Sequence, residues 1–403
     1  MSHISFKLDP REEPRTVLAA KGKRCSHRLT FNPSSAKPKE TLYIDVPHLP
    51  NDTVLVPGTL ALVGEFVLGG TKHANNRVVS NLGRCLVKRR VVKIGDKTIQ
   101  DLERADLIDV YGDLWRKDRK ERVEQGIQSL AVNKIRSKAG NKGTDTGDVA
   151  LAGSFPKYRI PLDIEPLQTH GVLQTGALPQ IRLEITLAAP EDVIFGEDAT
   201  KVGTYTFNNI ELIYQTIESM NFAQHLPHTF FFNHISHYKS ISYAKGTETK
   251  ITDNIPIQLK SFVGVLFLFV DPHTEGTRDS EKFVNPNVTK VEFDLNGIPN
   301  TLYPSGMLPS DVFETIYGGA EWLCSNKDVE RPTGFFENKY AIFADLRAAR
   351  DYEVHGDGQT SVGSGKNIQF RITRTVGGSG NGNCHIFILG DGVFDLSTQN
   401  LHY

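Results

Sequence analysis

The second half of the chain repeats short sequence patterns of the first half in the same order, and this repeat constrains the fold more than any other feature. Matched residues lie about 200 positions apart in a chain of 403 residues. A repeat of this length indicates a tandem pair of similar domains, because solenoid repeats are much shorter. The matches, in order, are Val63-Gly64 with Val263-Gly264, Lys93-Ile94-Gly95 with Leu295-Asn296-Gly297, Tyr111-Gly112 with Tyr317-Gly318, Trp115 with Trp322, Lys157-Tyr158 with Lys339-Tyr340, and Gln180-Ile181-Arg182 with Gln369-Phe370-Arg371.

Between these motifs, apolar and other residues alternate with the period of a β-strand. A pleated strand points successive side chains to opposite faces, so an alternating segment buries one face and exposes the other. The alternating segments are 41–46, 181–187, 290–295 and 370–373. Two further segments, 262–270 and 386–389, are apolar almost throughout, which predicts strands buried on both faces.

Helical patterns are scarce, and the 35 glycines and 20 prolines favour many turns between short elements. We expect one helix at about Asp106–Gln128 and a short second helix at Pro309–Glu321. The polar stretches 136–153 and 356–365 predict long exposed loops. Because 403 residues are too many for one ordinary core, the predicted fold class is all-β. It consists of two tandem eight-stranded jelly-roll β-sandwiches, a double jelly roll, with short helical excursions.

The same reasoning places the domain boundaries. We assign residues 41–218 to the first jelly roll, 219–229 to a linker and 230–403 to the second jelly roll. Residues 1–40 hold nine Lys and Arg against four acids, which predicts a basic, partly disordered N-terminal arm. The arm is either a solvated tail or an extended segment that orders against neighbouring subunits or faces packaged nucleic acid.

Charge, cysteine and hydropathy patterns exclude several classes of protein. The formal net charge of −1 gives no electrostatic reason for the whole chain to wrap nucleic acid. The four cysteines lack the short spacings of a zinc site or disulfide framework, which favours a reducing compartment. No apolar run approaches the roughly 18 residues of a membrane span, and the N-terminus lacks an apolar signal core. We therefore expect neither secretion by the standard route nor membrane insertion.

No motif predicts a nucleotide site or a metal site. The P-loop and the dinucleotide fingerprint are absent, and the glycine-rich stretch 377–383 joins two strands, which predicts a hairpin loop. A cluster of four histidines is interrupted by Pro227 and a run of three phenylalanines, and no cysteine or glutamate completes a ligand set. We interpret these residues as part of an inter-domain linker: His225, His228, His234 and His237.

Nucleophilic catalysis finds no support either. Cys384 and His385 are adjacent, but neighbouring strand residues point to opposite faces and cannot form a catalytic pair with each other. We therefore predict that the chain is not an enzyme and has no catalytic, cofactor-binding or metal-binding residues. Conspicuous strands, long loops and the lack of a convergent polar cluster are typical of a structural protein, which functions through its surface and not through an active site.

Several stretches resemble the major capsid (hexon-like) protein of Polinton/Maverick elements and adintoviruses, from about residue 54 to the C-terminus. The stretches are Val56-Pro57-Gly58-Thr59-Leu60, His73-Ala74-Asn75-Asn76, Lys157-Tyr158-Arg159-Ile160-Pro161, Arg278-Asp279-Ser280-Glu281-Lys282-Phe283-Val284-Asn285-Pro286, Asn296-Gly297-Ile298-Pro299-Asn300 and Gly380-Asn381-Gly382-Asn383-Cys384-His385. The resemblance implies a double jelly-roll capsid protein of the adenovirus-like lineage. It implies no catalytic residues, and it leaves the N-terminal arm uncovered.

The resemblance also implies how such a protein would work. Three chains would form a homotrimer, whose six jelly rolls make a pseudo-hexagonal capsomer that tiles an icosahedral virion shell. The expected partners are neighbouring capsomers and a penton or minor capsid protein, with a weak contact between the arm and packaged DNA and no small-molecule substrate. The protein would be made in the host cytoplasm. Two alternatives stay open: a jelly-roll glycan-binding protein, and a minor capsid or penton protein.

Overall fold

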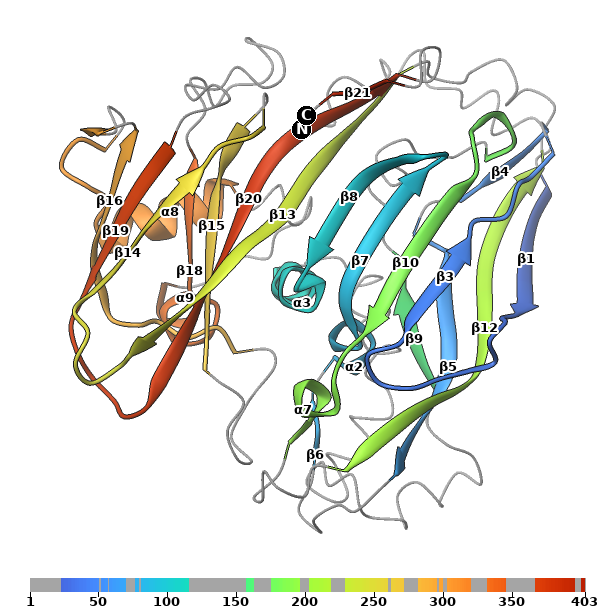
Figure 1. Cartoon of the computed structure of the whole chain (residues 1–403), viewed down its shortest axis with the longest axis horizontal. Helices are drawn as coiled ribbons and strands as arrows, with labels where there is room; N and C mark the ends of the chain where they lie inside the picture. The colour runs from blue at the N-terminus through green and yellow to red at the C-terminus, as the bar shows by residue number, and fades with distance from the viewer. Residues whose placement is uncertain are drawn as a thin grey trace.

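The computed structural model shows two β-sandwiches joined side by side (Figure 1). It describes residues 23–50, 52–56, 58–69, 77–79, 81–115, 157–162, 175–195, 203–218, 229–259, 262–271, 282–295, 297–299, 303–319, 332–345, 367–395 and 400–402. Each sandwich packs two antiparallel sheets face to face. Within these residues, no helix is both long and apolar enough to span a bilayer.

The second sandwich has the strand connectivity of a jelly roll. Along the chain, its strands alternate between the two sheets, apart from the β16–β17 turn and the β20–β21 connection, which each stay within one sheet. The inner sheet runs in the order β13 (Thr229–Ala244), β20 (Asn381–Asp395), β15 (Phe262–Val270) and β18 (Ala341–Asp345), and β21 (Asn400–His402) pairs with the end of β20. The outer sheet runs in the order β14 (Lys250–Pro256), β19 (Asn367–Arg374), β16 (Val288–Leu295) and β17 (Ile298–Pro299).

The first sandwich has the same connectivity. One sheet runs in the order β1 (Lys23–Thr30), β12 (Thr204–Glu218), β5 (Ala61–Gly69) and β9 (Lys157–Pro161), and β2 (Ser35–Ala36) and β4 (Thr53–Leu55) also pair with β12. The other runs in the order β3 (Thr41–Asp45), β10 (Ile181–Leu187), β7 (Val87–Ile94) and β8 (Lys97–Glu103). A separate pair joins β6 (Arg77–Val78) to β11 (Ile194–Phe195).

The sequence repeats fall on equivalent strands of the two sandwiches. Gly64 lies in β5 and Gly264 in β15, which hold equivalent places in the sheets of the two units. Gly95 lies in the β7–β8 turn and Gly297 in the β16–β17 turn, and both have positive φ, where a residue without Cβ is favoured. The fold is thus duplicated, as the repeats predict, although the residue-by-residue register differs between the halves.

A short helix follows β8 in the first sandwich and β17 in the second, at the two places where helices were predicted. The first is α3 (Ala105–Leu114), and the remainder of the predicted helix to Gln128 lies outside the described residues. The second is α8 (Pro309–Gly319), which agrees with the prediction. The other short helices are α2 (Leu82–Cys85), a 3-10 turn (Thr175–Ala177), α7 (Pro190–Val193) and α9 (Pro332–Asn338).

The predicted N-terminal boundary is wrong. The arm was expected to extend to residue 40, but β1 lies within it and pairs along its whole length with β12. Strand β1 is the first strand of the first jelly roll, so that unit begins at Lys23 and not at residue 41. Residues 1–22, most of the predicted linker 219–229 and the predicted loops 136–153 and 356–365 lie outside the described residues.

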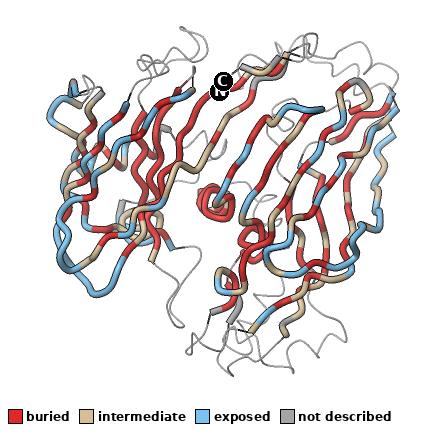
Figure 2. The backbone as a smooth tube through the Cα atoms, viewed as in Figure 1, coloured by how far each residue is buried: buried red, intermediate tan, exposed pale blue. Residues whose placement is uncertain are grey.

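The predicted strand faces are confirmed by burial. Leu42 and Ile44 are buried, whereas Tyr43 between them is 60% exposed. Every residue of β15 is buried, as the apolar run predicts, and Figure 2 shows this buried layer at the centre of the second sandwich. The ring of Phe267 packs 4.8 Å from Phe370 of the opposite sheet, so aromatic contacts join the two layers.

Three buried aromatic rings lie over glycines in the neighbouring strand. Phe207 of β12 covers Gly64 of β5 so closely that a Cβ on this glycine would lie 2.5 Å from the ring. Tyr243 and Phe232 of β13 cover Gly382 and Gly392 of β20 in the same way. These glycines let a large ring lie flat against the sheet, where any larger residue would overlap it.

Candidate functional site

The two jelly rolls contact each other along one side of each unit. Strand β8 of the first unit lies beside β13 of the second unit (Figure 1). Helix α3 contacts Phe283 and Lys339 of the second unit. Gln100 donates its side-chain N–H to the carbonyl of Ile235 at 3.5 Å. Tyr111 donates its hydroxyl to the carbonyl of Lys339 at 3.1 Å. The contact therefore fixes the two sandwiches to each other through polar as well as apolar groups.

Aromatic packing strengthens this contact. The ring of Tyr111 meets Phe283 edge-on at 4.9 Å, and Trp115 lies 6.3 Å from Phe335. The Lys339 ammonium lies 5.4 Å from the Trp115 ring, within the range of a cation–π interaction. Tyr111 and Trp115 are fully buried, and burial raises the pKa of the Tyr111 hydroxyl. The sequence repeats singled out both residues, but only the structure shows that they join the two units.

Buried ion pairs hold helix α3 in place beneath this contact. The Arg84 guanidinium lies 3.3 Å from the Asp113 carboxylate, which also accepts a 2.9 Å hydrogen bond from Asn81. Arg90 of β7 pairs with Asp109 at 2.8 Å. Removing one partner of such a pair leaves a buried charge without compensation, so these charges tie α3 firmly to α2 and β7.

The four histidines that were interpreted as part of a linker do not all lie in one. His225 and His228 lie outside the described residues, whereas His234 and His237 lie in β13, so the interpretation as linker residues is wrong for these two. The aromatic run before them belongs to the same strand, whose long pairing with β20 outweighs the local irregularity of the sequence. In the described part of the chain, no three His, Cys, Asp or Glu residues are grouped as metal ligands.

His237 has a partner that the sequence does not indicate. Its Nε2 lies 3.4 Å from Nδ1 of His385 in β20, and Ser240 Oγ lies 2.7 Å from the same Nδ1. Burial lowers the pKa of His237 to about 4 and that of His385 to about 2, with further lowering by the nearby Arg104. Burial also lowers the pKa of His234 to about 4. All three imidazoles are neutral at pH 7.

Cys384 and His385 show the alternation expected of adjacent strand residues. Cys384 is buried between the sheets of the second unit, beside Phe269 in the pairing register, and burial raises the pKa of its thiol. His385 lies on the opposite face, toward the first unit, where the charges of Arg104 act on it. This arrangement provides no thiolate–imidazole pair.

The glycine-rich stretch 377–383 is not the hairpin that we predicted. It leaves β19 of one sheet and enters β20 of the other, so it crosses between the layers of the sandwich. In a jelly roll, strands that follow each other along the chain usually belong to opposite sheets, which is why a short loop here does not form a hairpin. Gly378 and Gly380 adopt positive φ in this crossover.

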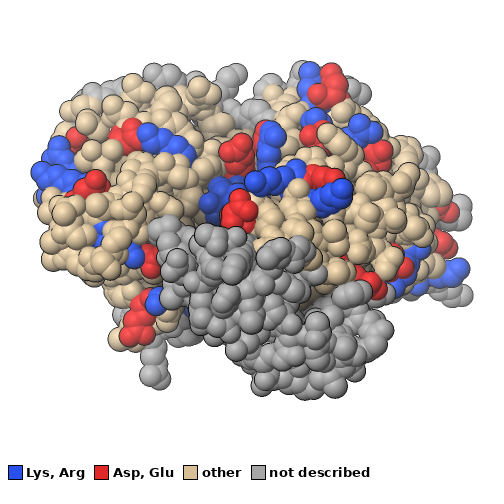
Figure 3. Space-filling view, turned by 60° about the horizontal axis from the view of Figure 1, so that its bottom comes forward, with Lys and Arg blue, Asp and Glu red and all other residues tan. Residues whose placement is uncertain are grey.

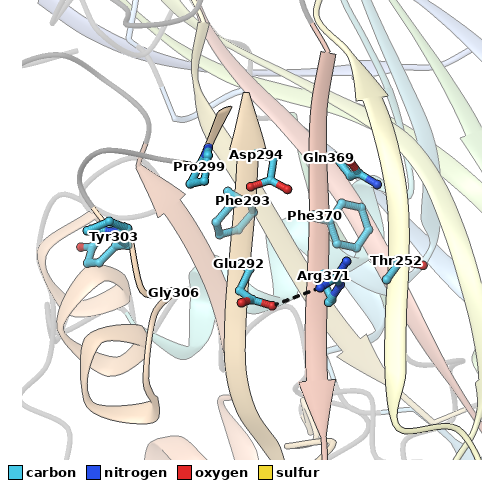
Figure 4. A pocket seen from close by; sticks show the side chains of 11 residues that line it. Thr252, Glu292, Phe293, Asp294, Pro299, Tyr303, Gly306, Gln369, Phe370 and Arg371 are labelled. Atoms are coloured by element: carbon cyan, nitrogen blue, oxygen red, sulfur yellow. Dashed lines mark ion pairs between the residues drawn. The ribbon is translucent and has the colours of Figure 1, made fainter. Parts of the chain in front are cut away.

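A shallow hollow lies on the outer face of β14, β19 and β16, beside β17 (Figure 4). Glu292 at its base is 2.7 Å from Lys290 and 3.8 Å from Arg371. The hydrogen bond from Lys290 lowers the pKa of Glu292, and this carboxylate is already neutralised by basic neighbours. Glu292 is therefore not suited to donate a proton at neutral pH.

The corresponding sheets of the two units differ in exposure. On β20, His385 and Phe387 point away from the core of the second unit, yet both are buried, and the first unit lies against this side. On the equivalent β12, Ile213 and Ile217 point outward and are only partly buried. The neighbouring β1 is largely exposed (Figure 2). Among the described residues, no element covers the outward side of the β1–β12 sheet as the first unit covers that of β20.

Helices α3 and α8 show the complementary difference. Helix α3 is buried along almost its whole length, because the second unit lies against it. Beside the equivalent α8, Leu308 is 53% exposed and Glu314 is also exposed. The first unit thus leaves exposed a sheet whose equivalent in the second unit is buried in the contact. The second unit leaves exposed a helix whose equivalent in the first unit is buried in the contact.

Surface charge does not define a nucleic-acid site on the face shown in Figure 3. Basic and acidic side chains are interspersed there rather than gathered by sign. Ion pairs among the described residues include Arg89 with Asp101 and Arg182 with Asp45. An alternating pattern of this kind gives no concentrated positive field for a phosphate backbone.

Comparisons with known proteins show similarity in structure rather than sequence. No family model and no curated protein matches the chain. A Sputnik virophage structure from cryo-EM matches with a TM-score of 0.58 and 11% identity, over 98% of this chain and 91% of that one. The crystal structure of PBCV-1 VP54, fitted into a reconstruction of the virophage Sputnik, matches with a TM-score of 0.56 and 13% identity, over 95% and 97%.

The fold is a double jelly roll. The Faustovirus major capsid protein shares it, with a TM-score of 0.52 and 10% identity, over 93% of this chain and 90% of that one. The double jelly roll here spans nearly the whole length of each of these chains.

Proposed function

We propose that the chain is the structural major capsid protein of an icosahedral virus and is not an enzyme. The observation that supports this most strongly is the doubled jelly roll itself, which matches solved structures of viral capsids over nearly their full length. A single sandwich would suffice for a penton or glycan-binding protein, so the doubling favours the major shell component.

The uneven exposure of the two units indicates how copies would assemble. In one chain, the β8–α3 side of the first unit meets the β13–β20 side of the second. The unused α8–β17 side of the second unit and the β1–β12 side of the first are the equivalents of those two surfaces. A contact of this head-to-tail kind, repeated between chains, closes into a ring if the rotation per unit is suitable.

A ring of three chains would contain six jelly rolls in pseudo-hexagonal order, and this homotrimer is the capsomer that we propose. Neighbouring capsomers and a penton or minor capsid protein would be its partners in the virion. We further propose that the chain belongs to the Polinton and adintovirus lineage and is made in the host cytoplasm. We divide it into a first jelly roll from Lys23 to residue 218, a linker to residue 228 and a second jelly roll from Thr229. Residues 1–22 would contact neighbours or DNA.

Size-exclusion chromatography with light scattering tests this proposal. The full chain should elute as a species of three times 44.8 kDa. Ile213→Lys and Leu308→Asp each place a charge on one of the two proposed contact surfaces, and each should weaken the trimer at least about 10-fold, or about 1.4 kcal/mol. Tyr43→Lys is the matched control, because Tyr43 is 60% exposed on a face outside both surfaces. A monomer that binds a glycan array would support a glycan-binding protein instead.

A further inference from the structure

A pair of histidines lies at the contact between the two jelly rolls. His237 comes from β13 and His385 from β20, and their ring centroids are 5.6 Å apart. The two imidazole nitrogens that face each other are 3.4 Å apart. Phe387 packs 5.0 Å from the His237 ring on the same side of the sheet. Both histidines lie on the side of the sheet that faces the first unit.

The first unit places charged groups opposite this pair. Arg104 acts on both histidines and is held by Asp106 at 2.8 Å and 3.0 Å. Lys88 also acts on both and is paired with Asp192 at 2.8 Å. Asp106 attracts a proton to the pair, but the repulsion from Arg104 outweighs that attraction.

The second unit adds its own charged and titratable groups. His234 lies three residues before His237 in β13, and Asp391 lies six residues after His385 in β20. Lys239 follows in β13 and pairs with Asp253 of β14, away from the contact. Among the described residues, the hydrogen-bond partners of His237 and His385 are each other and Ser240, and no carboxylate is among them.

Protonation changes the electrostatics of this contact in a defined direction. The neutral pair can share one N–H between facing nitrogens, which suits an apolar interface. If both rings are protonated, two positive charges face each other at 3.4 Å and also face Arg104. Hydration then favours exposing the two imidazolium rings, which requires the β13–β20 side to separate from β8 and α3.

We propose that His237 and His385 form an acid-sensitive latch on the second unit's side of the contact, so that the contact stays closed when both rings are neutral and opens on protonation. This inference concerns contacts within one chain, so it does not depend on the shell function proposed above. It predicts an opening between the units that precedes the unfolding of either sandwich.

The sign and size of the effect follow from proton linkage. A histidine with a lowered pKa in the closed state binds fewer protons there than in the open state, so the closed state loses stability as pH falls below about 6.5. For His237, with a pKa of about 4 when closed, the opening equilibrium should rise about 30-fold between pH 7.5 and pH 5. His385 would add to this rise, since its pKa in the closed state is lower still.

Hydrogen exchange of the full chain, measured by mass spectrometry between pH 7.5 and pH 5, tests the latch. After correction for the intrinsic pH dependence, protection in β8 and β13 should fall at least about 30-fold. Protection in β10, which lies away from the contact, should change little. If β8 and β13 lose no more protection than β10, the latch does not exist.

Variants separate the latch from general acid sensitivity. The double variant H237Q/H385Q removes the titrating groups and should flatten the pH dependence in β8 and β13. His27→Gln is the matched control, because His27 lies in β1 against Tyr214, outside the contact. Arg104→Met leaves both histidines in place and should reduce the loss of protection, which keeps the test decisive if the double variant fails to fold. An unchanged pH dependence in H237Q/H385Q, or in Arg104→Met, would overturn the proposal.

Discussion

Replacing Gly64 by alanine tests whether a glycine under an aromatic ring is a structural requirement of the first jelly roll. The added methyl group would lie 2.5 Å from the ring of Phe207, where ordinary contacts begin near 3.4 Å. Phe207 is fully buried in the hydrophobic core, so its ring cannot move out of the way into solvent. Overpacking of this kind costs about 1–3 kcal/mol.

Gly69→Ala is the matched control in the same strand. A Cβ at Gly69 would lie 3.6 Å from the Thr204 methyl group, which is an ordinary contact. Because alanine restricts the unfolded chain more than glycine, this variant should be neutral or stabilised by about 0.4–1 kcal/mol. The two substitutions add the same methyl group to β5 and are expected to change the free energy of unfolding in opposite directions.

Urea unfolding, followed by circular dichroism at matched protein concentration, measures both changes. A double-mutant cycle with Phe207→Leu adds a second test, since Phe207→Leu should cost less in the Gly64→Ala background than alone. Equal midpoints for Gly64→Ala and Gly69→Ala, or additive effects in the cycle, would refute the argument that Phe207 and Gly64 occupy the same space.

Two further substitutions test other buried contacts. Arg374 is 3% exposed and donates hydrogen bonds to the carbonyls of Pro286 and Lys245. Arg374→Met should therefore lower the free energy of unfolding, measured by urea titration, by about 3 kcal/mol. Arg371→Met on the exposed face is the control and should change it by less than about 0.5 kcal/mol. Tyr111→Phe removes the hydrogen bond to the Lys339 carbonyl and should lower the stability of the contact between the units by about 1 kcal/mol. Hydrogen exchange in α3 and α9 should then be faster in the variant than in the unmodified protein. Equal exchange in both would show that this hydrogen bond does not stabilise the contact.

The sequence predicts the sandwich strands well because burial on one face imposes a period of two. It fails for β1, whose residues Lys23–Thr30 are mostly polar and exposed. An edge strand with little buried surface carries almost no apolar alternation, so its place in the sheet depends on pairing with β12, a partner nearly 190 positions away. Local patterns carry no information about such a partner, which explains why the first unit was predicted to begin too late.

The contact between the units could be predicted only in part. The repeats mark Tyr111 and Trp115 as equivalents of second-half residues, but duplication alone does not show that they contact the other unit. The pair His237 and His385 is separated by 148 positions, and its members come from different strands. Their meeting follows from the register of β13 on β20, including an irregularity after His237 that no local pattern indicates.

Electron microscopy of the purified chain tests the central claim most directly. We expect compact trimers in which six jelly rolls form a pseudo-hexagonal ring and the α8 side of one chain covers the β1–β12 sheet of the next. Single separate chains, or a trimer that leaves Ile213 and Leu308 facing solvent, would contradict it.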